Sequence, residues 1–247
     1  MIYLFGDLHG SENILQFDKE TFSIGKTLTK DDYVIILGDF GIPWARFDSA
    51  NYYREMKRLK YLSDKPWTTL FIDGNHENFE NLEMFEKVNK FGSTVQQLEE
   101  NIFHLLRGNI YNINDKNFFV MGGALSIDKN NRIPRVSWWK EEQPSKKELD
   151  HGLDNLKKNN NKVDYILTHT CSNKIAEEVL KSSLQSLFIH DPLSKYFDVI
   201  DKKISYKRWF FGHFHIDIEI SDKYYCLYKT YYQLDCSTNE VKVVGGI

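Results

Sequence analysis

Short apolar runs alternate with longer polar segments along most of the chain. Several runs are rich in β-branched and aromatic residues and stop abruptly at Gly, Asp, Asn or His, which is typical of buried strands. Because segments of helical period separate the runs, the pattern predicts an α/β sandwich. The five runs with the sharpest polar ends are 2–6, Tyr33–Leu37, Trp67–Ile72, Val163–Leu167 and Arg208–Phe211.

Amphipathic spacing and capping signals predict the helices. In Asn51–Ser63 the apolar residues recur near one face. Ser145 followed by Glu148 forms a capping box, which predicts a helix that begins there and ends near Lys158. The other predicted helices are Ser11–Phe22, Phe79–Phe91 (with irregular chain after it), Asn173–Leu187 and Leu193–Lys203.

The remaining apolar runs predict short strands and one long connection. The connection, Ser126–Pro144, has little periodicity, and loops of this length tend to serve as lids or binding loops. No repeat, low-complexity tract or linker divides the chain, so residues 1–247 are expected to form a single domain. The predicted short strands are Ile102–Leu106, Ile110–Ile113 and Phe118–Met121, with antiparallel strands in the tail at Ile216–Ile220, Tyr224–Tyr228, Tyr231–Asp235 and Val241–Val244.

Composition narrows the class of protein. With 247 residues, 41% of them hydrophobic, the chain can bury one sizeable core. Its mean hydropathy is -0.50, and no apolar run approaches the roughly 20 residues of a membrane helix. Met1 leads straight into the first strand, and three cysteines imply no disulfide framework. We therefore expect a cytoplasmic protein without a leader segment or a membrane partner, and with Cys171 as a small buried thiol.

The charge balance argues against general nucleic-acid binding. Net charge is -3, so no global basic field holds bulk nucleic acid through its phosphates. Lysines gather at 146–162 and 195–208. We interpret these clusters as the solvent-exposed faces of helices and not as a basic rim that attracts substrate. A nuclease remains compatible with this balance only through local attraction of phosphate by bound cations.

Each of the five runs named above is followed by side chains that can bind a metal ion. In an α/β sheet, loops from separate strands converge at the carboxyl ends of the strands. A single Asp-x-His pair is equally explained by a helix cap beside an incidental histidine, but five such ends in one chain are not. Five of the eight histidines lie there. The side chains delivered are Asp7 and His9, Asp39, Asn75 and His76, His169, and His213 and His215.

This donor set favours transition metals. Carboxylates, an amide oxygen and imidazoles suit Mn²⁺, Fe²⁺, Zn²⁺ or Ni²⁺ better than Ca²⁺, which prefers an all-oxygen shell. Seven ligands are too many for one ion that also keeps a water. They suit two ions about 3.5–4 Å apart with a shared carboxylate, which lower the pKa of a bridging water and clamp the oxygens around phosphorus.

The same residues resemble the five signature blocks of the calcineurin-like metallophosphoesterases. The blocks occur in the family's order and span residues 6–215, and the Gly-Asn-His-Glu and Gly-His-x-His blocks are together highly specific. They are Asp7-Leu-His9, Gly38-Asp39, Gly74-Asn-His-Glu77, the lone His169 and Gly212-His-Phe-His215.

The resemblance implies a role for each residue and a four-layer α/β/β/α fold, a two-sheet sandwich flanked by helices. Asp39 would bridge two metals, of which Mn²⁺ is the favoured identity, and a metal-bridging hydroxide would be the nucleophile. His76 would face the phosphate and protonate the leaving alkoxide, while Asn75 would also touch a phosphate oxygen. The ligands of one metal would be Asp7, His9 and His215, and those of the other Asn75, His169 and His213.

Departures from the family's protein phosphatases favour a phosphodiester substrate. Those enzymes carry arginines within the second block and just before Gly-Asn-His-Glu, where this chain has Phe40 to Trp44 and Asp73. Without these bidentate clamps a phosphomonoester dianion is held less well. The last block has a second histidine, which many phosphodiesterases and nucleases of the superfamily share, and this also favours a phosphodiester substrate. Nucleotides and nucleic acid are the substrates expected.

Two other functions stay open. One is a phosphomonoesterase that acts on small metabolites or phosphoproteins. The other is a non-catalytic scaffold of the same fold, which is disfavoured because every ligand position and His76 are filled. No P-loop, dinucleotide-binding or nucleophile-elbow motif is present, and the sequence locates no dimer face.

Several residues near the blocks invite both structural and functional interpretations. Arg132 lies in a stretch similar to one in other superfamily members, so it either binds the phosphate from the lid or is an exposed loop residue. Trp138 and Trp139 are more simply packing residues than base-stacking ones. Trp44 is expected to wall the pocket near Asp39. Glu77 either caps the next helix or orients His76.

Overall fold

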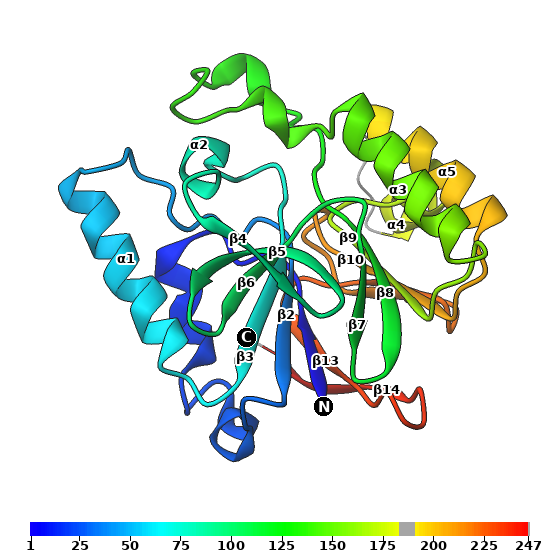
Figure 1. Ribbon diagram of the computed structural model, residues 1–247, viewed down its shortest axis with the longest axis horizontal. Helices are drawn as coiled ribbons and strands as arrows, with labels where there is room; N and C mark the ends of the chain where they lie inside the picture. Colours follow the sequence, from blue (N-terminus) through cyan, green and yellow to red (C-terminus); the bar gives the residue numbers. More distant parts are fainter. Residues whose placement is uncertain (183–190, 247) are drawn as a thin grey trace.

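Two mixed β-sheets pack face to face in the computed structural model, which describes residues 1–182 and 191–246 (Figure 1). The first sheet has the strand order β14 (Val241–Gly246), β13 (Thr230–Leu234), β1 (Ile2–Phe5), β2 (Tyr33–Leu37), β3 (Thr68–Ile72), β6 (Ile102–Leu105), β5 (Ser93–Glu99) and β4 (Glu86–Lys90). The second has the order β11 (Ile218–Ile220), β12 (Tyr224–Cys226), β10 (Arg208–Phe211), β9 (Tyr165–Thr168), β8 (Lys116–Met121) and β7 (Ile110–Ile113).

The period-two alternation of the strands divides the core into layers. Leu4 of the first sheet and Val120 of the second belong to the buried cluster between the sheets. Their chain neighbours, Phe5 and Phe119, face the opposite way, each into a cluster shared with helices. Both faces of the central strands are therefore apolar, as expected for strands covered on two sides.

Helices cover both outer faces, so the predicted sandwich flanked by helices is confirmed. The first sheet is covered by α1 (Ala50–Ser63) and two 3-10 helices, η1 (Ser11–Phe17) and η2 (Ser23–Thr27). The second is covered by α3 (Lys146–Lys158), α4 (Asn173–Ser182) and α5 (Pro192–Lys203), at the upper right of Figure 1. The capping box of Ser145 and Glu148 at the start of α3 is also confirmed.

Two predicted helices are wrong in part. The helix expected over Ser11–Phe22 is instead η1 followed by a turn and η2, because Phe17 and Phe22 pack edge-on into one aromatic cluster that a continuous helix would separate. The helix expected over Phe79–Phe91 is only α2 (Phe79–Leu82), and β4 and β5 follow it. β4 is almost wholly polar, so its pairing with β5 and not its own pattern makes it a strand.

Smaller differences concern the tail and α4. The tail strands β11 and β12 are antiparallel to each other as predicted, but β12 runs parallel to β10. The last five residues of the helix expected over Asn173–Leu187 lie outside the described residues. In the part of the chain that the structure describes, no helix has both the length and the apolarity needed to cross a membrane. The assignment of residues 1–247 to a single domain stays a prediction.

Candidate metal centre

The five predicted ligand loops meet at one edge of the sandwich. Asp7, His9 and Asp39 follow β1 and β2, which are parallel neighbours in the first sheet. His213 and His215 follow β10 of the second sheet, and the backbone N–H of His213 donates to Asp7 Oδ1 at 3.0 Å. Side chains from both sheets therefore share one site.

One half of the site consists of four residues whose ligand atoms all lie within 4.8 Å of one another: Asp7, His9, Asp39 and His215. His215 Nε2 lies 3.2 Å from Asp7 Oδ2 and 2.8 Å from His9 Nε2. His9 Nδ1 lies 3.7 Å from Asp39 Oδ2. Two imidazole nitrogens and two carboxylates facing one another are the surroundings that a divalent transition metal prefers.

The other half is arranged around His169. Its Nε2 lies 3.2 Å from Asp39 Oδ1 and 3.2 Å from Asn75 Oδ1, and its ring centroid is 5.0 Å from that of His213. Its Nδ1 lies 2.8 Å from the carbonyl oxygen of Leu37, so Nδ1 donates there and Nε2 is directed at Asp39 and Asn75. All seven predicted ligands are thus brought together, with Asp39 between the two halves.

The backbone is strained where it carries these side chains. His9, Asp39, His213 and His215 have φ of 55°, 48°, 71° and 52°, in the left-handed region that residues with a Cβ seldom adopt. Neighbouring glycines allow close approach. A Cβ built on Gly74 would lie 2.1 Å from Asp39 Oδ1.

Electrostatics show that the buried carboxylates require positive charge. Burial by itself lowers the pKa of His169, but Asp39 and Asp7 outweigh it and raise that pKa to about 10. Burial and the neighbouring His169 lower the pKa of His213 to about 3. The two carboxylates thus favour a positive charge on His169, whereas burial and His169 favour the neutral form of His213. The donor set and this demand for cationic charge both fit divalent metal ions.

His76 and Arg132 lie beside the two halves. The backbone N–H of His76 donates to Asp39 Oδ1 at 2.8 Å, and its ring lies 5.3 Å from that of His9. Arg132 Nη1 and Nη2 lie 3.0 and 3.2 Å from His76 Nδ1 and Nε2, so the guanidinium covers the imidazole. Burial, partly opposed by Asp39 and assisted by Arg132, lowers the pKa of His76.

The tryptophans and Glu77 have structural surroundings. Trp139 is buried and packs edge-on against Trp44, whose ring centroid is 6.4 Å from that of His76. Glu77 does not cap the next helix, because the N-cap of α2 is Asn78. Its carboxylate accepts the backbone N–H groups of Phe40 and Gly41 at 2.7 and 2.9 Å, which holds the loop that carries Asp39. Burial and Asp39 raise the pKa of Glu77 to about 8.

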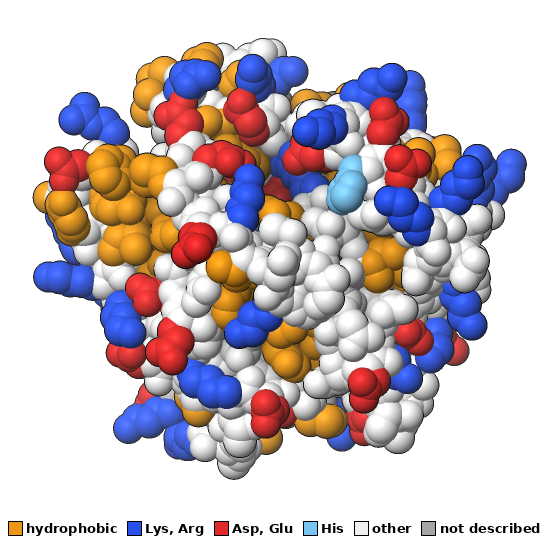
Figure 2. Space-filling model, viewed as in Figure 1, with side chains coloured by type: hydrophobic (Ala, Val, Ile, Leu, Met, Phe, Trp, Pro, Cys, Tyr) orange, Lys and Arg blue, Asp and Glu red, His pale blue; other side chains and the backbone are white. Residues whose placement is uncertain are grey.

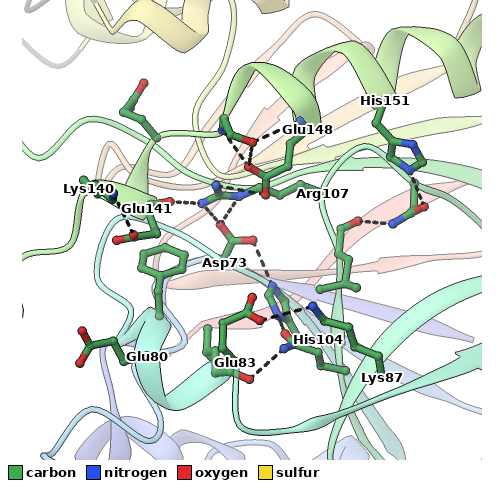
Figure 3. Close-up of a pocket in the computed structure, with 17 residues that line it drawn as sticks. Asp73, Glu80, Glu83, Lys87, His104, Arg107, Lys140, Glu141, Glu148 and His151 are labelled. Atoms are coloured by element: carbon green, nitrogen blue, oxygen red, sulfur yellow. Dashed lines mark hydrogen bonds and ion pairs between the residues drawn. The ribbon is translucent and has the colours of Figure 1, made fainter.

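Sequence reasoning missed the residues that support the loop after β3. Asp73 is buried between Arg107, whose Nε donates to it at 2.8 Å, and His104, whose Nε2 lies 3.0 Å away (Figure 3). On the other side, Ser126 Oγ accepts from Asn75 Nδ2 at 3.1 Å and so directs Asn75 Oδ1 toward His169. Nothing in the hydrophobic pattern marks these residues, because their partners are far away in sequence.

The site opens into two cavities, and a third lies behind it. A cavity of about 480 Å³ reaches from Asp39, His76 and His213 to apolar side chains that include Leu125 and Phe214. One of about 320 Å³ is also lined by His76, together with His9 and Trp44. The third, of about 870 Å³, is lined by the Asp73–Arg107 network and by no predicted metal ligand (Figure 3).

Of the comparisons with known proteins, the one with family sequence models identifies a family. The sequence model of the calcineurin-like phosphoesterase family matches residues 1–217. The search of curated proteins returns no match. Among solved structures, the chain is similar to the Thermus thermophilus sulfate thiohydrolase SoxB in complex with glycerol, at 12% identity and a TM-score of 0.45. That alignment covers 99% of this chain but only 56% of the SoxB chain, so the chain spans little more than half the length of that protein.

Proposed function

The chain belongs to the calcineurin-like phosphoesterase family, and from this premise we propose that it is a phosphodiesterase that works with two divalent metal ions. The main support is the meeting of seven oxygen and nitrogen donors from both sheets around Asp39. Asp7, His9 and His215 would hold one ion, Asn75, His169 and His213 the other, and Asp39 both. Mn²⁺ is the first choice for the test.

The chain's own residues bind and orient the ester. Bound divalent ions would neutralise phosphate charge and lower the pKa of the attacking water. Arg132, which lines the cavity of about 480 Å³, would contact a phosphate oxygen, and Asn75 would bind another. His76 would stand opposite the leaving group. As the water oxygen bonds to phosphorus and the ester P–O bond breaks, the leaving oxygen would take its proton from His76.

The arrangement of cations supports a diester over a monoester. Asp73 occupies the place where the family's protein phosphatases have an arginine, and its carboxylate is directed at Arg107, into the cavity behind the site. Among the residues that the structure describes, Arg132 is the one guanidinium that lines the cavity at the metal ligands. One such clamp suits the single negative charge of a diester better than a dianion.

The test compares bis(p-nitrophenyl) phosphate with p-nitrophenyl phosphate in the presence of Mn²⁺. We expect a higher kcat/KM for the diester. Asp39→Asn should abolish both activities, because the residue shared by the two ions is lost. Faster hydrolysis of the monoester would support the alternative, a phosphomonoesterase. Failure of the metal-loaded protein to hydrolyse either compound would contradict the proposal and favour a scaffold.

A further inference from the structure

Two exposed aromatic rings lie near the start of α1, Phe47 just before the helix and Tyr53 in its first turn. Each keeps 55% of its surface exposed. Figure 2 shows hydrophobic side chains gathered at the left of the view, where Figure 1 places α1, with Lys and Arg side chains at the margin. Phe47 is held in place by edge-on packing against Tyr52.

Three cations without carboxylate partners are sequence neighbours of these rings. Arg46, Arg54 and Lys57 are exposed, and among the described residues none has a carboxylate oxygen within 4.0 Å. The acids of the segment are occupied. Asp48 accepts from the Tyr53 hydroxyl, and Glu55 accepts from two backbone N–H groups. No acidic residue lies in the first turn of α1 itself.

Trp44 connects this surface with the site. It lines the cavity of about 320 Å³ together with His9 and His76, and the same cavity is bounded by Glu55 of α1. Trp44 is three residues before Phe47 and Glu55 is two residues after Tyr53, so the wall of this cavity and the exposed rings belong to the same stretch of chain. His76 lines both the smaller and the larger cavity, so a substrate held at His76 borders on both.

We propose that Arg46, Phe47, Tyr53, Arg54 and Lys57, here called the α1 platform, bind single-stranded nucleic acid and direct it to the candidate metal centre. Bases stack on Phe47 and Tyr53, and the cations contact the phosphates on either side. This inference rests on the proposed phosphodiesterase function and names its substrate class. The net charge of -3 is compatible with it because the binding charge is local.

Single strands fit the platform better than the other anionic partners. Aromatic stacking needs unpaired bases, whereas a duplex keeps its bases inside and offers mainly phosphates. A lipid surface is bound by the continuous apolar face of an amphipathic helix, whereas the platform has two exposed rings, of which only Tyr53 is on α1. A protein partner of ordinary size buries about 800 Å² on each side, far more than two rings and three cations supply.

The decisive measurement is the binding of a fluorescein-labelled single-stranded oligothymidylate, followed by fluorescence anisotropy in EDTA, which stops hydrolysis. The variant Tyr53→Ala/Lys57→Ala removes one ring and one cation. We expect its affinity to fall about tenfold or more, since one stacked base contributes a factor of about 5–150. The slope of log affinity against log salt should fall by about 0.7, the value for one phosphate contact on a single strand.

Matched variants separate the platform from general charge. Leu153→Ala/Lys157→Ala removes an exposed apolar residue and a cation at the same spacing in α3, and it should bind like the wild type. Tyr53→Phe keeps the ring and should do so too. Equal losses in both double variants, equal affinity for duplex and single strand, or no binding by the wild type would overturn the inference.

Activity measurements distinguish failure of the α1 platform from failure of the proposed phosphodiesterase function. In Mn²⁺ the platform variant should lose more kcat/KM on the oligonucleotide than on bis(p-nitrophenyl) phosphate, which is too small to reach the platform. If the wild type hydrolyses the small diester but no variant changes oligonucleotide binding, only the platform is wrong. If it binds the oligonucleotide but hydrolyses no phosphoester, the platform stands and the phosphodiesterase proposal falls.

Discussion

Gly74 illustrates how single atoms define the site. Its missing Cβ leaves room for Asp39, whose Oδ1 also accepts the N–H of His76. The sequence suggests which residues belong to the site because carboxylates and imidazoles follow apolar runs. It does not reveal that Asp39 itself adopts a left-handed backbone, because that conformation is imposed by contacts with Glu77 and Gly74 across the chain.

Gly74→Ala should therefore displace Asp39 without preventing folding. Overpacking of this kind costs about 1–3 kcal/mol, and misplacing a ligand should weaken Mn²⁺ binding about 10–100-fold. Calorimetric titration measures the affinity, and urea unfolding measures the stability. Gly246→Ala, whose Cβ would meet its nearest neighbour at 3.7 Å, is the matched control and should change neither. Unaltered Mn²⁺ affinity in Gly74→Ala would mean that Asp39 is not a ligand.

His76 allows a test of leaving-group protonation. A p-nitrophenolate leaves without a proton, whereas an alkoxide needs one. His76→Asn should therefore reduce kcat far more for a diester with an alkyl leaving group than for bis(p-nitrophenyl) phosphate, with about 10²–10⁴-fold expected for the former. Mn²⁺ affinity, measured alongside, should stay near the wild-type value. Equal losses on the two diesters would argue that His76 orients the phosphate and donates no proton.

At the scale of elements, the sequence predicts a strand when the strand's own side chains form an apolar pattern. Runs such as Tyr33–Leu37 are apolar on both faces and become central strands. β4 could not be predicted, since its single apolar residue, Val88, gives no period and only pairing with β5 makes it a strand. For the same reason the sequence did not reveal the support behind β3, where Asp73 follows β3 while its partners His104 and Arg107 lie in and just after β6, more than 30 residues further along.

Breaking this support should destabilise the whole sheet edge. Arg107→Met keeps most of the side-chain volume but leaves the carboxylate of Asp73 buried without its cation. Removing one partner of a buried ion pair costs about 3–5 kcal/mol, measurable as a lower urea midpoint at an unchanged m-value. The double variant Asp73→Asn/Arg107→Met removes the orphaned charge and should recover part of the loss. A double variant less stable than the sum of both single changes would contradict this explanation.

At the scale of the molecule, the site joins two sheets that otherwise meet through apolar packing and a few hydrogen bonds, such as the one that the Tyr111 hydroxyl donates to the carbonyl oxygen of Thr94. β1, β2 and β3 supply Asp7, His9, Asp39 and Asn75, whereas β9 and β10 supply the other three ligands. The sequence could predict this convergence because every block follows a buried apolar strand, and the carboxyl ends of such strands meet at one edge of the fold. It could not predict that β13 pairs with β1 of the first sheet and β14 with β13, since the pattern of an antiparallel strand does not indicate which strand it pairs with.

Because the ligands come from both sheets, bound metal should stabilise the whole fold and not one loop. A ligand that binds only the folded state at 100 times its Kd adds about 2.7 kcal/mol, which corresponds to a rise in Tm of about 5–10 °C for a chain of this size. Mn²⁺ should produce this shift, EDTA should reverse it, and Asp39→Asn should abolish it. Near-ultraviolet and far-ultraviolet circular dichroism should shift together, since aromatic packing and strands then melt in one transition. A shift in the aromatic signal alone would mean that the metal tightens the loops while the two sheets unfold independently of it.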